Sequence, residues 1–235
     1  YEGIEAITID ISGGDITIYP SDDGLNANGG SDGFMMGGGF GRGGWNQQDT
    51  ETASETTDSE EEEATWVHIS GGTLTIINAD ARDADGIDSN GDVIITGGTI
   101  RVSLPGGGSN NAIDFGSENG GEALISGGNL VAAGGSSMAE NFESSSEQCI
   151  IMLNFSKLVE GGTAIQILDG SGNELLNYAP PQSYNSVYLS SPDIVLGETY
   201  TIVYGENTEE VSMDSTVVTA SSGTGARGRM GGGGM

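Results

Sequence analysis

Apolar and polar residues alternate in a short pattern that recurs along the first part of the chain. Each copy contains the tetrapeptide Ile-Ser/Thr-Gly-Gly, followed by a second short alternating stretch. Period-two alternation bounded by glycine pairs is typical of strands that meet at a turn, so we predict a strand on each side of every pair. The tetrapeptides are Ile11–Gly14, Ile69–Gly72, Ile95–Gly98 and Ile125–Gly128.

A second motif has the form acid or amide, small residue, apolar residue, acid or amide. Four copies follow the glycine pairs and begin at Asp23, Asp85, Asn111 and, more loosely, Glu140, and a fifth copy opens the chain at Glu2. Such a unit cannot bury its apolar face alone, but stacked units can share one core. We therefore predict an all-β fold, a right-handed parallel β-helix with a small β-rich C-terminal cap. An antiparallel β-sandwich is the alternative, but it would not require the same glycines and acids to return in register.

The repeats predict how the chain is divided. Residues 1–147 form the rungs, and a Gly/Met-rich and then acidic segment, roughly 31–65, is read as an inserted solvated loop because it holds too little apolar surface to pack. Residues 148–219 form the cap, and 220–235 a flexible Gly-rich tail. Strands of the cap are expected at 149–155, 163–168, 174–178, 186–190 and 199–204.

Charge narrows the classes of partner. The chain has 35 acidic and 6 basic residues, a formal charge of -29. Nucleic acid and anionic membrane surfaces would be repelled, whereas divalent cations would be attracted. No apolar run is long enough to span a bilayer, so we expect no membrane insertion. Because Cys149 is the single cysteine, an internal disulfide is excluded. We expect its thiol to be buried where the rungs meet the cap.

The acid motifs predict a calcium site. If the central apolar residue of each motif faces the core, the flanking acids point outward and stack in two columns, with neighbouring rungs about 4.8 Å apart. Calcium takes oxygen ligands at roughly 2.3–2.6 Å, so carboxylates on adjacent rungs could share one ion. Asp and Asn before Gly are also favoured in turns for backbone reasons alone, which leaves a purely structural reading open. The predicted ligands are Glu2, Glu5, Asp23, Asn26, Asp85, Asp88, Asn111, Asp114, Glu140 and Glu143.

These motifs resemble a bacterial family of secreted, calcium-binding parallel β-helix carbohydrate-binding domains that bind polygalacturonate and cellulose. The matching residues are Tyr1–Ala6, Ile11–Gly14, Ser21–Ala27, Ser190–Pro192 and Gly197–Tyr200. The resemblance implies a calcium-loaded β-helix similar in shape to pectate lyases. It also implies an extracellular or cell-surface location, with the signal peptide absent from this chain, and an acidic plant polysaccharide as the ligand.

We therefore expect a calcium-dependent polysaccharide-binding protein, in which bound ions bridge to sugar carboxylates because protein and ligand are both anionic. Trp66 is a candidate for sugar stacking, although the adjacent insertion could cover it. Arg82 and Arg101 are further candidate ligand contacts, and either could serve as the base that a pectate-lyase-like elimination needs, so that activity remains an alternative. Self-association through the β-helix ends, giving a calcium-stabilised matrix or filament subunit, is another.

Overall fold

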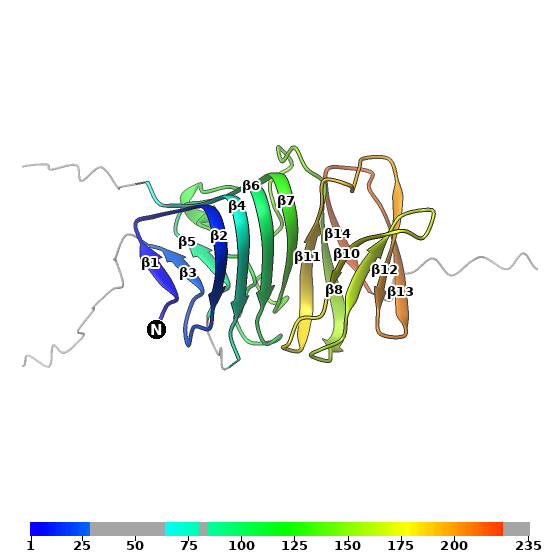
Figure 1. Cartoon of the computed structure of the whole chain (residues 1–235), viewed down its shortest axis with the longest axis horizontal. Coiled ribbons are helices and arrows are strands. Elements are labelled where there is room, and N and C mark those ends of the chain that lie inside the picture. Colours follow the sequence, from blue (N-terminus) through cyan, green and yellow to red (C-terminus); the bar gives the residue numbers. More distant parts are fainter. Residues whose placement is uncertain (29–63, 80–83, 223–235) are drawn as a thin grey trace, which may run out of the picture.

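The computed structural model describes residues 1–28, 64–79 and 84–222, and within these ranges the fold is all-β, which confirms the predicted class. Its strands form three sheets (Figure 1). The helical structure in these ranges is one short 3-10 turn, Ser117–Asn119, so none of the described helical structure has the length or hydrophobicity to cross a membrane.

The largest sheet begins with four parallel strands that come from successive repeats (Figure 1). Identical positions of successive repeats lie side by side in it, as Ile69 does with Ile11 and Ile95. Side chains on one face of each strand are buried, because alternate residues of a strand point to opposite faces. The four strands are β2 (Thr8–Ile18), β4 (Trp66–Ile77), β6 (Asp92–Ser103) and β7 (Ala123–Gly134).

The glycine pairs lie inside these strands, which corrects the prediction of two strands separated by a turn. Each long strand continues through its pair with a local irregularity in register. The second glycine of the pair has positive φ, 84° at Gly72 and 91° at Gly98. That conformation is costly for residues with a Cβ, so glycine lets the strand bend there without leaving the sheet.

A second, smaller sheet packs against the first. Its three parallel strands contain the apolar residues of the acid motifs, and Ile113 adds a parallel bridge to Ile87. Leu25 and Ile87 are fully buried in the same core as Val67 and Ile69 of the large sheet. The strands are β1 (Ile4–Ala6), β3 (Leu25–Ala27) and β5 (Ile87–Ser89).

The C-terminal part extends the large sheet rather than only covering its end. Strand β11 (Tyr184–Ser190) pairs antiparallel with both β7 and β8 (Ile150–Val159), and β14 (Val217–Ser221) pairs parallel with β8. The large sheet is therefore mixed. A separate antiparallel sheet with its own apolar cluster completes this part, and it contains β9 (Ile165–Leu168), β10 (Glu174–Tyr178), β12 (Thr199–Tyr204) and β13 (Asn207–Ser212).

Five of the C-terminal strands were predicted. The bounds of β10 and β12 are as predicted, those of β8, β9 and β11 differ by a few residues, and β13 and β14 were not predicted. Because Ala220 belongs to β14, the tail boundary predicted at residue 220 is wrong. Residues 31–63 of the predicted insertion and 223–235 of the predicted tail lie outside the described residues. Cys149 is a buried free thiol, as predicted.

Candidate functional site

The first column of motif residues is aligned by backbone hydrogen bonds between repeats. The N–H of Gly24 donates to the carbonyl of Asp85 at 2.9 Å, and the N–H of Gly86 donates to the carbonyl of Asn111 at 2.9 Å. Glycine is required for this approach, because a Cβ on Gly86 would lie 2.5 Å from the carbonyl oxygen of Ala112. These backbone hydrogen bonds therefore place the first residue of one motif beside the first residue of the next motif in the stack.

The carboxylates of this column also bind the neighbouring repeat. Asp23 Oδ1 accepts the backbone N–H of Asp85 at 2.7 Å, and Asp85 Oδ1 accepts the backbone N–H of Asn111 at 2.6 Å. These bonds run between repeats, not within one turn, so the local-turn reading does not describe these two residues. Each acid helps to set the register of the next repeat.

Two acids of the second column, from neighbouring repeats, lie close to an acid of the first column. Asn26 pairs in register with Glu5 on one side and Asp88 on the other, and the N–H of Asp114 donates to the carbonyl of Ile87 at 2.8 Å. Carboxylate oxygens of Asp85, Asp88 and Asp114 all lie within 4.8 Å of one another. Three oxygens at this separation can reach a single cation with ligand distances near 2.4 Å.

Partial burial makes the ionised form of these carboxylates energetically unfavourable unless a cation is bound. Desolvation raises the pKa of Asp85 to about 8 and that of Asp88 to about 7, with further increases from neighbouring carboxylates. The pKa of Asp23 and that of Asp114 are raised for the same reasons. The charges that raise them are carboxylates, so the cluster has the electrostatics of a cation site.

Two amide oxygens beside the cluster have no hydrogen-bond partner among the described residues. These are Oδ1 of Asn26 and Oδ1 of Asn111, on side chains that are 5% and 2% exposed. The Nδ2 group of Asn26 donates to Asp23 at 3.0 Å, which leaves its oxygen as the free end. A buried carbonyl oxygen without a donor is destabilising, and a hard cation would satisfy it. The donor set therefore fits calcium.

The outer predicted ligands are less closely placed. Glu2 and Glu140 act electrostatically on Asp23 and Asp114, respectively. Glu5 is exposed at its register position. Glu143 is not joined to the cluster by any interaction among the described residues; its backbone N–H donates to Ala123 at 2.8 Å.

Sequence reasoning missed Glu118, whose charge raises the pKa of both Asp88 and Asp114. It lies on the 3-10 turn that follows the fourth acid motif. Among the described residues a 3-10 turn occurs once, so no periodic signal pointed to it.

Two of the three candidate ligand contacts outside the acid columns, Trp66 and Arg101, lie on the large sheet. Trp66 and Arg101 are half-buried on β4 and β6, on the face opposite Val67 and Val102, which face the core. Arg82 lies outside the described residues.

The fold and the cluster together define an all-β protein with a half-buried, oxygen-rich site suited to a hard cation. A family model described as "Carbohydrate-binding domain-containing protein" matches residues 43–171, which include Asp85, Asp88 and Asp114. The chain belongs to this family. Membership indicates carbohydrate binding and a binding module rather than a catalytic one. No curated protein and no solved structure matches the chain.

Proposed function

We propose that this protein binds an acidic, polygalacturonate-like polysaccharide in a calcium-dependent manner, outside the cell or at its surface, with cellulose as a second polysaccharide to test. The observation that carries the proposal is the cluster of Asp85, Asp88 and Asp114, whose carboxylate oxygens lie within 4.8 Å of one another. Family membership supports a carbohydrate as the ligand.

The proposal includes a right-handed parallel β-helix over residues 1–147. Parallel pairing of β2, β4, β6 and β7, and of β1, β3 and β5, supports it, because both sheets then take one strand from each repeat. In such a coil the acids of successive rungs lie above one another. The two columns of the site follow from that arrangement.

Calcium would have two roles at this site. It would neutralise Asp85, Asp88 and Asp114, whose mutual repulsion is strengthened by burial. It would also offer open coordination positions to a sugar carboxylate, because calcium takes six to eight oxygen ligands. An anionic protein could then bind an anionic polymer without direct contact between like charges.

A binding role is favoured over an elimination reaction. A lyase of the pectate type needs a basic residue beside the calcium-bound uronate. The lysine and arginine side chains among the described residues are Lys157 of β8 and Arg101 of β6. Neither is among the charges that act on Asp85 or Asp88, which are carboxylates, so the described residues supply no base beside the cluster. We therefore propose a binding module.

The proposal is tested by retention of the protein on insoluble polygalacturonate, on cellulose and on a neutral glucan, with calcium and then with chelator. We expect retention on polygalacturonate that chelator abolishes. Retention on none of the three would reject polysaccharide binding, and a calcium-induced increase in light scattering would then support the self-assembling matrix subunit. Retention that is unchanged by chelator would reject the calcium bridge.

A further inference from the structure

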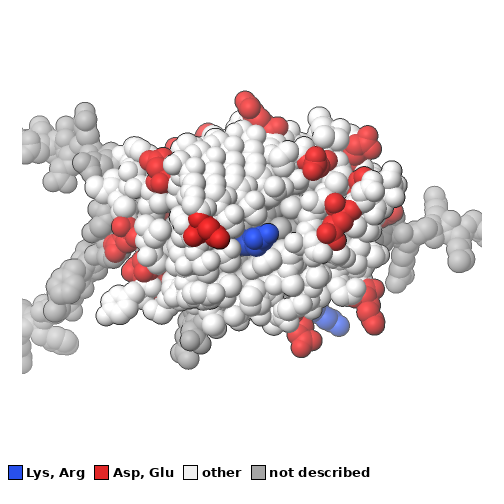
Figure 2. Space-filling view, in the orientation of Figure 1, with Lys and Arg blue, Asp and Glu red and all other residues white. Residues whose placement is uncertain are grey.

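A groove on the outward face of the large sheet contains an arginine that forms no ion pair with any carboxylate of the described residues. It lies between β6, β7 and β10, encloses about 260 Å³, and is lined by residues including Thr99, Arg101, Asn129, Leu176 and Asn177. Figure 2 shows this face with one basic side chain near its middle. Arg101 of β6 is the basic residue that lines the groove.

Arg101 has no ion pair and no side-chain hydrogen bond within the part of the chain that the structure describes. The contact it makes is with the ring of Tyr178, whose centroid lies 5.8 Å from the guanidinium carbon. An unpaired arginine is unexpected in a chain with a formal charge of -29. The tyrosine ring holds the guanidinium in place through a cation–π contact and leaves its five N–H donors free.

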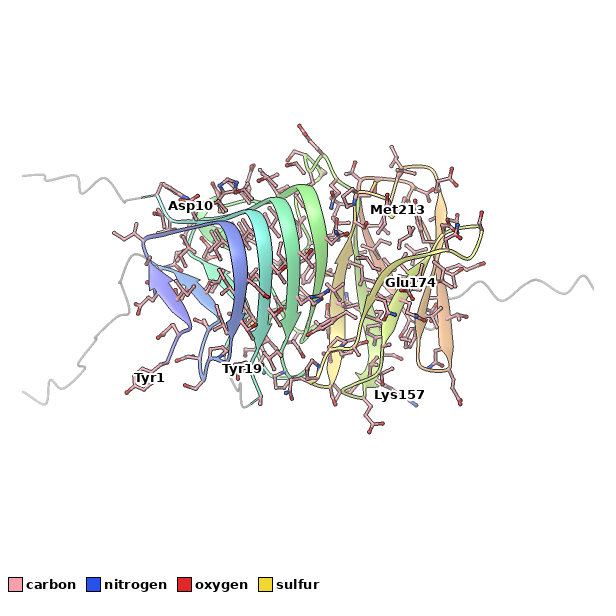
Figure 3. The ribbon with its side chains drawn as sticks, viewed as in Figure 1. Tyr1, Asp10, Tyr19, Lys157, Glu174 and Met213 are labelled. Carbon is pink, nitrogen blue, oxygen red and sulfur yellow. The ribbon has the colours of Figure 1, made fainter. Side chains whose placement is uncertain are left out.

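The acidic side chain of β10, Glu174 (Figure 3), already accepts hydrogen bonds from two amides. Glu174 Oε2 accepts hydrogen bonds from Asn177 at 3.0 Å and from Gln166 at 2.7 Å. Glu174 therefore fixes the Asn177 amide at the groove wall, with its carbonyl oxygen left as an acceptor.

The remaining wall offers unused polar groups around the guanidinium. Thr99 and Asn129 are paired in register on β6 and β7, and neither side chain has a hydrogen bond among the described residues. The hydroxyl of Tyr178 is also buried and without a partner there. A sugar ring can hydrogen-bond to the hydroxyl and amide groups and can pack against the aromatic ring and the apolar wall. The groove volume is below the roughly 300–1,000 Å³ of pockets for drug-sized ligands, so the groove suits a single sugar ring.

We propose that this groove is a second carbohydrate subsite, in which Arg101 binds the carboxylate of one uronic acid residue without calcium. A planar carboxylate accepts two parallel N–H bonds from a guanidinium, a geometry that a neutral sugar cannot reproduce. The subsite rests on the proposed binding of acidic polysaccharide, but it uses different residues from the carboxylate cluster.

The test is a titration of the full chain with trigalacturonate in the presence of chelator, followed by calorimetry and by the NMR signals of the arginine Nε–H groups. We expect weak, chelator-resistant binding that shifts the Arg101 signal, and no binding of the fully methyl-esterified trisaccharide. Arg101→Gln should weaken binding by about tenfold or more, because it removes a charge-assisted bond pair. Lys157→Gln should leave it unchanged.

Arg101→Lys provides a second variant if Arg101→Gln unfolds the protein. It retains the charge but loses the planar pair of donors, and we expect binding between that of the wild type and that of Arg101→Gln. Equal affinity for the acid and its methyl ester, or an unshifted Arg101 signal, would overturn the subsite. Absence of chelator-resistant binding, with calcium-dependent retention on polygalacturonate intact, would reject the subsite and leave the proposed function standing.

Discussion

The Asp85 carboxylate accepts the backbone N–H of Asn111, with 2.6 Å between Oδ1 and the nitrogen. The same side chain belongs to the cluster in which carboxylate oxygens of Asp85, Asp88 and Asp114 lie within 4.8 Å of one another. One carboxyl group therefore helps to set the register of the next repeat and faces the candidate cation site. Stacking of the repeats and cation binding should be energetically coupled, because they depend on the same atoms.

Substitution of Asp85 by Asn should have opposite effects with and without calcium. Without calcium the variant removes a half-buried charge from the cluster but keeps an acceptor for Asn111, so at pH 8 we expect a higher Tm than that of the wild type. With calcium we expect an affinity lower by about tenfold or more and little stabilisation by the ion. Calorimetric titration and thermal unfolding measure both effects.

The control for this substitution is Glu210→Gln, which removes an exposed carboxylate from β13. It should change neither calcium affinity nor Tm in calcium by a measurable amount. If Asp85→Asn binds calcium as tightly as Glu210→Gln does, the cluster is not the calcium site.

The raised pKa values predict how stability depends on pH in the absence of calcium. The native protein retains protons on Asp85, with a pKa of about 8, and on Asp88, with a pKa of about 7, whereas the unfolded chain releases them near the ordinary aspartate pKa of 3.8. The native state therefore binds more protons across this window, and its free energy of unfolding falls as pH rises from about 4 to about 8.

Urea unfolding in chelator at pH 5 and at pH 8 measures this dependence, and we expect the lower midpoint at pH 8. Calcium competes with protons, so the stabilisation it gives should be larger at pH 8 than at pH 5. A calcium-free protein that is equally stable or more stable at pH 8 would contradict the burial of the two ionisable groups.

The unpaired amide oxygen of Asn111 can be tested by Asn111→Asp. The substitution replaces the amide by a carboxylate of nearly the same shape next to Asp85. We expect tighter calcium binding, because a charged ligand replaces a neutral one, and lower stability in chelator, because another buried charge joins the cluster. The exposed Asn207→Asp is the matched control. Unchanged affinity in Asn111→Asp would show that this position is not a ligand.

The glycine of the acid motif should tolerate no side chain. A Cβ at Gly86 would lie 2.3 Å from Val102 Cγ1 and 2.5 Å from the carbonyl oxygen of Ala112. We expect Gly86→Ala to lower the free energy of unfolding by about 1–3 kcal/mol or more, since neighbouring repeats would have to move apart. Gly170→Ala is the control, because a Cβ there meets nothing within 4 Å. Equal midpoints for the two variants in urea would contradict the close packing of the repeats.

Much of the body could be predicted because its signal is periodic. The return of Ile69 and Ile95 at equivalent positions indicated strands with a shared core, and the acids of successive motifs indicated the two columns. The repeat did not indicate that the chain stays in one strand through each glycine pair, because alternation alone does not distinguish a bend from a turn. Glu118 was missed because it lies on a 3-10 turn that occurs once in the part of the chain that the structure describes.

By itself, the sequence determined the all-β class, the buried positions and the acids that stack, because these follow from side-chain periodicity and from its return along the chain. Tertiary structure alone decided that Asp85, Asp88 and Asp114 converge, which acceptors are left unpaired, and that β11 joins β7 to β8. It also placed β10 and its Tyr178 beside Arg101. These relationships depend on how distant segments pack, and no local pattern of residues encodes that packing.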